Sequence, residues 1–206
     1  EMFHSPALKA VICNSEMVKQ DILRCYQVQP DNIHVIHNAI NGEHFQPATE
    51  KARFAARETL NLPQHATVFI YVGSGFERKG LKAAIEAIAK SDRYLIVVGQ
   101  DKQQQRYHQL AQQLGCAQRL RFVGVQQDVR PFYHAADGLL LPTLYDPFPN
   151  VVLEAMACGL PVITSTGCGG AEFIVAGQEG FVCDALDISA LTEAVNAIPA
   201  LSQNSA

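Results

Sequence analysis

The chain has 206 residues, of which 48% are hydrophobic and 17% charged, the balance of an ordinary globular protein. A formal net charge of −4 and a sequence pI near 6.0 exclude the basic surface that binds nucleic acid or an anionic membrane. The sequence shows no signal peptide and no apolar run near the roughly 18–20 residues of a transmembrane helix, and its length fits one large domain or one domain with a piece of another.

Residues 1–47 predict the end of one domain and a linker. A strand, a helix and a second strand are predicted there, at 10–13, from about 15 to 26, and at 33–36. Asn14 or Ser15 can cap the helix, and the turn-rich HNAINGEHFQP follows the second strand. The chain opens on Glu1 in mid-pattern rather than on a methionine, which fits a piece of a longer protein, and processing of the N-terminus is the alternative.

Residues 48–206 predict one α/β domain, with a boundary between Pro47 and about Thr67. The segment 48–60 is helical in pattern and charged. Near-continuous apolar segments then predict strands at 67–72, 94–98, 120–123, 138–142, 161–165 and 180–183. Helices are predicted between and after them, near 80–90, 102–114, 128–136, 151–158, 170–176 and 188–197. This alternation indicates a doubly wound, Rossmann-like parallel sheet covered on both faces.

The six cysteines are scattered and form no CxxC pair: Cys13, Cys25, Cys116, Cys158, Cys168 and Cys183. This favours buried or idle thiols in a reducing cytosol. A zinc site built from the last three cysteines and a histidine is an alternative, but it lacks the usual ligand spacing. His34 and His37 lie three apart in a strand-like segment, on opposite faces, so we expect them to be structural.

In an open parallel sheet, ligands bind outside the carboxyl ends of the strands, so the loops after the strands are the place to look. The first of them, VGSGFERKG at 72–80, is a glycine-rich turn with Arg78 and Lys79 at the entry of a helix. Exposed amides, a helix N-terminus and two cations suit an anion such as a diphosphate. The glycine spacing matches neither the dinucleotide fingerprint nor the Walker A loop, and an ordinary turn with a solvated Arg-Lys pair is the alternative.

The loop and helix at 145–162, YDPFPNVVLEAMACGLPV, carry two acids, Asp146 and Glu154. The prolines hold the loop extended, Asn150 can cap the helix, and Gly159 can end it. Glu154 is expected in the first helical turn, where the helix dipole favours a negative charge. A stabilising role there is one interpretation. The other is that two acceptor-only carboxylates at the ligand edge bind the vicinal hydroxyls of sugars.

The spacing D-x7-E followed by AMACGLPVI, with ERKG upstream and GCGGAEFI downstream, resembles the donor-binding half of a retaining glycosyltransferase of the GT-B fold, family 4. The family motif is E-x7-E. The resemblance extends over essentially the whole chain, since VICNSEMVKQDI and IHVIHNAINGEHFQP look like the last elements of the family's N-terminal domain and its linker. VGSGFERKG and VVGQDK resemble most closely the lipopolysaccharide-core glucosyltransferase I subgroup, which uses UDP-glucose.

The resemblance implies roles for the charged residues. Glu154 matches the acid that binds the ribose hydroxyls, and Asp146 matches the acid that contacts the donor sugar, although most members have the longer Glu there. Lys79 matches the lysine that binds the diphosphate. Ser74 stands where many members carry a diphosphate-binding arginine, and Arg78 is placed to compensate.

The resemblance also implies roles for backbone groups. The turn of Gly73 and Gly75 would contribute amides to the diphosphate, and the backbone of Val125 would contact the base. The turn that cradles sugar and phosphate corresponds to Phe148, Pro149, Asn150 and Val151. For Glu172, in the glycine-rich TGCGGAE, we favour a role in capping a helix over contact with the ligand.

The implied activity is transfer of a hexose, with retention, from a UDP-sugar to a glycan or lipid-linked acceptor such as lipopolysaccharide core. The implied reaction needs no cofactor and no metal. The family architecture places acceptor binding and membrane contact in the other domain, so the whole protein would be cytoplasmic or peripheral to the inner face of the membrane. The domain at 48–206 would lack its final helix, and this chain alone would bind donor weakly and transfer nothing.

Three other functions remain as alternatives. A UDP-sugar epimerase of the same fold would need a pair of acid–base residues, and no such pair is marked in the sequence. A nucleotide-sugar binding module without transfer activity would differ from a transferase in the products of the full-length protein. A dehydrogenase is disfavoured because the fingerprint is broken and no acid ends the strand at 94–98.

Overall fold

The computed structural model describes residue 3, residue 5 and residues 7–203 of the chain. The N-terminal segment contains a two-stranded parallel sheet, with β1 at Val11–Cys13 and β2 at Ile33–Val35. Helix α1, Glu16–Cys25, and the short 3-10 turn η2, Pro30–Asn32, connect the two strands. The hydroxyl of Ser15 accepts a hydrogen bond from the Val18 amide at 3.2 Å, so Ser15, rather than Asn14, caps α1.

The main body is built on a six-stranded parallel sheet in the order β5-β4-β3-β6-β7-β8. The strands are β3 (Val68–Val72), β4 (Tyr94–Val98), β5 (Leu120–Gly124), β6 (Gly138–Leu141), β7 (Val162–Ser165) and β8 (Gly180–Cys183). The order confirms the doubly wound fold predicted from the sequence. It reverses at β3, which pairs with β4 on one side and β6 on the other. A crevice outside the carboxyl ends of β3 and β6 is therefore the expected ligand position.

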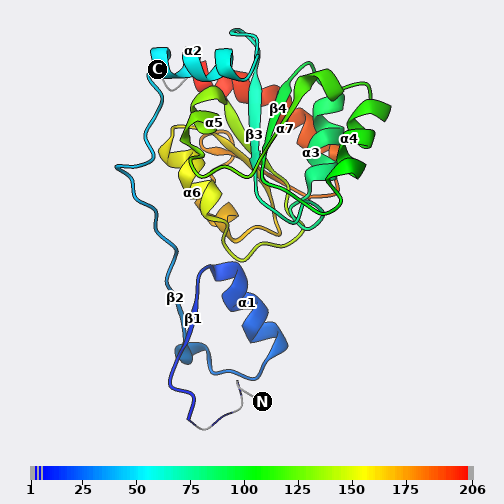
Figure 1. The fold of residues 1–206 in the computed structure, drawn as a ribbon. Helices are drawn as coiled ribbons and strands as arrows, with labels where there is room; N and C mark the ends of the chain where they lie inside the picture. The colour runs from blue at the N-terminus through cyan, green and yellow to red at the C-terminus, as the bar shows by residue number, and fades with distance from the viewer. Residues whose placement is uncertain (1–2, 4, 6, 204–206) are drawn as a thin grey trace.

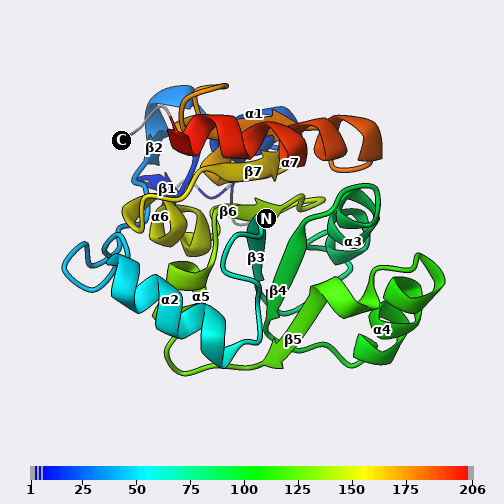
Figure 2. The same ribbon diagram turned by 90° about the horizontal axis from the view of Figure 1, so that it is seen from above.

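Helices cover both faces of this sheet. On one face lie α3 (Leu81–Ala89), α4 (Gln104–Gln113) and α7 (Ile188–Gln203); on the other lie α2 (Glu50–Thr59), α5 (Arg130–Ala135) and α6 (Asn150–Ala157). Figure 2 shows the sheet running between these two layers. All five residues of β3 are buried. This confirms the prediction, from its continuous apolar sequence, that the strand is covered on both faces.

The C-terminal part of the body differs from prediction at two places. The helix expected at 170–176 is only a 3-10 turn, η4, at Gly169–Phe173. The sequence has glycines at 167, 169, 170 and 177, and glycine is a poor helix former, so this segment cannot sustain an α-helix. Helix α7, in contrast, continues to Gln203, six residues beyond the predicted end at 197.

A buried arginine attaches α2 to the body. The Arg57 side chain is 1% exposed and donates to the backbone oxygens of Ala135, Gln64 and Ala66 at 2.9, 2.7 and 2.8 Å. Its guanidinium also pairs with the Asp137 carboxylate at 2.7 Å, and that carboxylate accepts from the amide of Val68 at the start of β3. Burial lowers the pKa of Arg57, while Asp137 opposes that shift. These bonds fix α2 against the segments that lead into β3 and β6.

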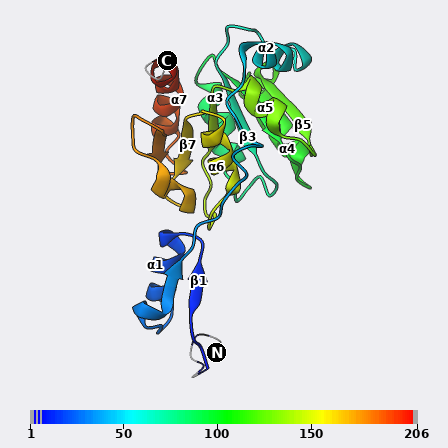
Figure 3. The ribbon, with the colours of Figure 1, turned by 90° about the vertical axis from the view of Figure 1, so that its left-hand side faces the viewer.

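The N-terminal segment lies beneath the body and is joined to it by an extended linker after β2 (Figures 1 and 3). It faces the loops at the carboxyl ends of the strands. The hydroxyl of Tyr145, in the loop after β6, donates to Asp21 of α1 at 2.9 Å. The amide of Glu16 donates to the Glu172 carboxylate at 3.0 Å. The predicted ligand edge is therefore the side of the body that the N-terminal segment approaches.

Within the described ranges, no helix is both long and apolar enough to cross a membrane.

Candidate functional site

Two loops meet closely at the carboxyl ends of β3 and β4. The Gly73 amide donates to the Val98 carbonyl at 2.9 Å, and a Cβ at Gly99 would come within 2.2 Å of the Gly73 carbonyl oxygen. The Phe76 amide donates to the Asp101 carboxylate at 3.0 Å. Only glycine permits this backbone approach, since Gly99 also has φ +121°. The glycine-rich turn is thus held rigidly at the predicted edge, while Ser74 and Gly75 are exposed on it.

The two predicted cations converge on the predicted acid. The ammonium of Lys79 lies 3.1 Å from Oδ2 of Asp146, and Arg78 Nη1 lies 3.2 Å from the same oxygen. The Lys79 and Asp146 side chains are 13% and 10% exposed, whereas Arg78 is 52% exposed. The two cations and the one carboxylate have a net charge of +1, and they lie beside β3, where the order of the strands reverses. This cluster suits an anionic ligand.

Backbone contacts hold Asp146 at this point. Its amide donates to the Gly167 carbonyl, and its carbonyl accepts from the Gly169 amide, both at 2.9 Å. A side chain at Gly167 would meet the Leu144 carbonyl oxygen at 2.3 Å, and one at Gly169 would meet the Pro147 oxygen at 1.8 Å. The glycines of TGCGG therefore let the loop after β7 pack directly against the loop after β6. Their role is to fix the position of Asp146.

Lys79 is positioned by the turn that precedes it. A Cβ at Gly73 would lie 2.4 Å from Cδ of Lys79, so the lysine stem crosses directly over the glycine. The Lys79 amide donates to the Gly75 carbonyl at 3.1 Å, and the Arg78 carbonyl accepts from the Leu144 amide at 2.8 Å. The sequence predicted both cations at the entry of a helix. In the structure, the loop after β6 also holds the backbone of Arg78 in place.

The start of α6 corrects two predictions. Pro149, not Asn150, occupies the cap position and no side chain caps this helix; Asn150 is the first helical residue, and its side chain accepts from Asn38 at 2.8 Å. Glu154 is then the fifth residue of α6, beyond the first turn where it was expected. The prediction at the other end is confirmed, since Gly159 follows the C-cap with φ +74°.

Glu154 is held by a buried tyrosine of α5. The hydroxyl of Tyr133, which is 0% exposed, donates to Oε2 of Glu154 at 2.8 Å. Burial, and then the charge of Glu154, raise the pKa of Tyr133 well above its ordinary value, so its hydroxyl keeps the proton that it donates. Glu154 is itself half-buried. Its second oxygen, Oε1, is not involved in this bond.

The remaining predicted residues lie around the same edge. Val125 follows β5 and is 62% exposed. Phe148 is buried, with its ring centroid 5.8 Å from that of His37 and 5.7 Å from that of Phe173. Val151, in the first turn of α6, is half-buried. The side chains of Phe148 and Pro149 are therefore buried within the loop, and the role predicted for the backbone of this turn stays a prediction.

Glu172 caps a helix, but a different one from that expected. Its Oε2 accepts from the amide of Glu16, the first residue of α1, and its Oε1 lies 2.7 Å from Nε2 of His37. His37 is thus structural, as predicted. Together with the Asn38–Asn150 bond, these contacts fasten the N-terminal segment to the ligand edge.

The sequence reasoning missed Tyr133, Asn38 and the partner of Glu172. Tyr133 was expected only as part of the helix at 128–136, and nothing in its local sequence shows that its hydroxyl reaches a residue 21 positions away. Over residues 3, 5 and 7–203, no group of three or more His, Cys, Asp and Glu side chains could hold a metal ion. Burial raises the pKa of Cys158 to about 11.

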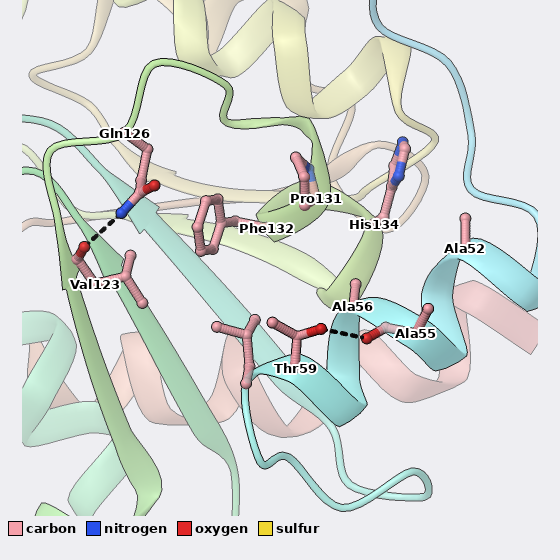
Figure 4. Close-up of a pocket in the computed structure, with 10 residues that line it drawn as sticks. Ala52, Ala55, Ala56, Thr59, Val123, Gln126, Pro131, Phe132 and His134 are labelled. Atoms are coloured by element: carbon pink, nitrogen blue, oxygen red, sulfur yellow. Dashed lines mark hydrogen bonds between the residues drawn. The ribbon is translucent and has the colours of Figure 1, made fainter.

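A cavity of about 500 Å³ lies between α2, α5 and the end of β5 (Figure 4). Its lining includes Ala52, Ala56, Phe132 and His134, and none of the predicted site residues. At one side Gln126 donates to the Val123 carbonyl at 2.6 Å. The wall is largely apolar, and neither Lys79, Arg78 nor Asp146 contributes to it, so this cavity is not the predicted anion site.

Comparisons with known proteins identify a family and a fold. The family model for glycosyl transferases group 1 matches residues 52–204, and a second model, Glycosyltransferase Family 4, matches residues 2–44. The lipopolysaccharide core biosynthesis glycosyltransferase LpsE of Rhizobium meliloti (strain 1021) is 35% identical over 145 residues, which are 70% of this chain and 43% of LpsE. The lipopolysaccharide glucosyltransferase WaaG of Escherichia coli (strain K12) is 31% identical over 169 residues, 79% of this chain and 45% of WaaG.

Among solved structures, Anabaena HepE in complex with UDP-glucose superposes with a TM-score of 0.85 and 24% identity, covering 95% of this chain and 55% of HepE. That likeness shows the fold. The chain spans about half the length of the curated relatives that it matches. With a parallel sheet of this order and a family match over most of its length, the chain belongs to the glycosyl transferases group 1 family, and its body is the C-terminal, Rossmann-like domain of a GT-B glycosyltransferase.

Proposed function

We propose that the whole protein is a retaining, metal-independent glycosyltransferase of family 4 that transfers glucose from UDP-glucose to a lipopolysaccharide-core acceptor. The observation that carries this proposal is the pairing of Lys79 and Arg78 with Asp146 beside the glycine-rich turn. The names of LpsE and WaaG support the acceptor class, and that of WaaG supports glucose. The HepE complex supports UDP-glucose as the donor.

The cluster has the charges that departure of a nucleoside diphosphate requires. As the bond from the sugar to the diphosphate breaks, negative charge grows on the leaving oxygens, and preorganised cations and amides stabilise it. Lys79 is held over Gly73 in the resting protein, so little reorganisation is needed to bring its ammonium to a phosphate. Arg78, which is half exposed, and the turn at 73–75 complete the group. This set of donors is why we propose that no metal is needed.

The two acids act by positioning rather than as acid and base. Asp146 lies between the cations and is proposed to receive the hydroxyls of the donor sugar, with its backbone fixed by Gly167 and Gly169. Glu154 is proposed to bind the ribose hydroxyls, because an ionised carboxylate only accepts hydrogen bonds and can accept them from two vicinal hydroxyls. The backbone of Val125, an exposed residue after β5, is proposed to contact the base. Holding both rings in register contributes to the rate through orientation.

We assign residues 1–47 to the end of the preceding domain and its linker, and 48–206 to the donor-binding domain. Acceptor recognition and any membrane contact are then assigned to the other half of the protein, and the reaction to the cytoplasm or the inner face of the membrane. It follows from this division that the 206-residue chain alone transfers no sugar.

The proposed activity predicts a specific product. The full-length protein, given UDP-glucose and a truncated lipopolysaccharide core, is expected to form an α-linked glucoside, and a chelator is expected to leave the rate unchanged. The anomeric configuration is measured by the proton coupling of the product in nuclear magnetic resonance. A β-linked product contradicts retention, and loss of activity with chelator contradicts metal independence. Conversion of the UDP-sugar to its isomer without transfer identifies an epimerase instead.

A further inference from the structure

The linker between the N-terminal segment and the body runs along the whole of α6. At the start of this helix, the Asn38 side chain donates to Oδ1 of Asn150 at 2.8 Å and to the Phe148 carbonyl at 3.4 Å. At its end, Pro47 lies in van der Waals contact range of the Cβ position of Gly159. Helix α6 also carries Glu154, so the linker lies alongside the element that holds the proposed ribose carboxylate.

A tight turn in the linker presents one aromatic side chain to the body. The carbonyl of Asn41 accepts from the amides of His44 and Phe45 at 3.0 and 3.2 Å, and its side chain accepts from the Glu43 amide at 2.9 Å. Gln46 closes the turn by donating to the Gly42 carbonyl at 2.6 Å. Phe45 is thereby fixed in orientation, and it packs against the core.

Phe45 contacts the tyrosine that holds Glu154. The rings of Phe45 and Tyr133 meet edge to face, with centroids 6.0 Å apart and planes at 82°. The Tyr133 hydroxyl then bonds Oε2 of Glu154 at 2.8 Å. A continuous chain of contacts therefore leads from the linker, through one buried ring, to one oxygen of the carboxylate. The bond leaves Oε1 available to a ligand.

We propose that Tyr133 is a positioning residue that orients Glu154 for the ribose hydroxyls, and that Phe45 makes this orientation depend on the docked linker. The proposal rests on the proposed function of Glu154. A glutamate side chain has three rotatable bonds, and ordering it on ligand binding is unfavourable. The bond from Tyr133 orders it beforehand, so the carboxylate already points in one direction when the nucleotide arrives. An undocked linker removes the support of the Tyr133 ring and loosens this order.

The test compares two nucleotides, UDP and 2′,3′-dideoxy-UDP, which lacks the ribose hydroxyls, by calorimetric titration of this chain. Tyr133→Phe, which removes only the hydroxyl, is expected to weaken UDP binding about 10-fold, the effect of losing a hydrogen bond to a charged group. Its affinity for the dideoxy nucleotide is expected to equal that of the wild type. Phe45→Leu is expected to weaken UDP binding about 3-fold, again with no effect on the dideoxy nucleotide. A purely structural role would weaken both nucleotides alike.

Two matched controls exclude general effects of the substitutions. Tyr94→Phe removes a hydroxyl at the start of β4, at the opposite end of the strand from the ligand edge. Phe54→Leu replaces an exposed aromatic ring on α2 by a smaller aliphatic side chain. Both are expected to leave UDP binding unchanged. Unchanged UDP affinity in Tyr133→Phe, or an equal loss for both nucleotides, overturns the proposal.

The outcome separates this proposal from the one on which it rests. If wild-type chain binds UDP and loses it in Glu154→Ala, but Tyr133→Phe binds normally, the role of Glu154 stands and that of Tyr133 falls. If the wild type binds both nucleotides equally and Glu154→Ala changes neither, the ribose role of Glu154 is wrong, and the role of Tyr133 falls with it.

Discussion

Replacing Lys79 by alanine is expected to lower kcat for sugar transfer by the full-length protein about 10²–10³-fold, the usual effect of removing one preorganised donor to a developing oxyanion. The Lys79 side chain is 13% exposed and its ammonium lies 3.1 Å from Asp146, so water screens this charge poorly. Its removal leaves the Asp146 carboxylate with only the half-exposed Arg78 beside it. The remaining Arg78–Asp146 pair carries no net charge, so the cluster would lose the positive charge that attracts the diphosphate. The effect is measured by steady-state transfer of labelled glucose from UDP-glucose.

Lys82 offers a matched control for this substitution. It lies three residues further along the chain, in the first turn of α3, with a side chain that is 60% exposed and paired only with Glu86. Lys82→Ala is expected to change kcat less than 2-fold, because exposed pairs of this kind contribute little. Equal rates for Lys79→Ala and wild type would show that the diphosphate does not bind at this cluster.

Replacing Arg57 by methionine is expected to lower the free energy of unfolding by about 3–5 kcal/mol, the effect of removing one partner from a buried ion pair. Methionine fills much of the volume but donates nothing. The carbonyls of Ala135, Gln64 and Ala66 would lose their donors, and Asp137 would keep only Arg53 as a charged partner. Because α2 would lose its main attachment, the loss should appear as a lower urea midpoint at an unchanged slope.

Arg24 serves as the control for Arg57. Its side chain is 77% exposed and pairs with Asp21 three residues earlier in α1. Arg24→Met is expected to change the free energy of unfolding by less than about 1 kcal/mol. If Arg57→Met and Arg24→Met had the same urea midpoint, the buried network would not be what fixes α2.

The sheet was predictable from the sequence because its strands are continuous apolar runs between turn residues. VFIYV of β3 and YLIVV of β4 are buried almost throughout, as expected for strands of a parallel sheet covered on both faces. The proximity of Lys79, Arg78 and Asp146 could also be predicted from the sequence. Parallel strands end at one edge, so loops far apart in sequence are brought together there by topology alone.

The details that the sequence could not supply depend on contacts between distant segments. Asn150 had the chemistry of a cap, yet Asn38, 112 positions away, binds its side chain and Pro149 takes the cap position. Glu172 was predicted to cap a helix, yet the helix that it caps is α1, whose first residue lies 156 positions earlier in the chain. Tyr133 gave no local signal at all. Propensity and spacing describe a residue's neighbours along the chain, whereas these roles are set by neighbours in space.

The measurement that tests the donor-binding site most directly is calorimetric titration of this chain with UDP, UDP-glucose, GDP and ADP, alongside Glu154→Ala and Lys79→Ala. We expect wild-type chain to bind UDP and UDP-glucose more tightly than GDP or ADP, and we expect both variants to lose that binding. Absence of heat with every nucleotide at millimolar concentration, or equal binding by wild type and both variants, would contradict the assignment of this edge as the donor site.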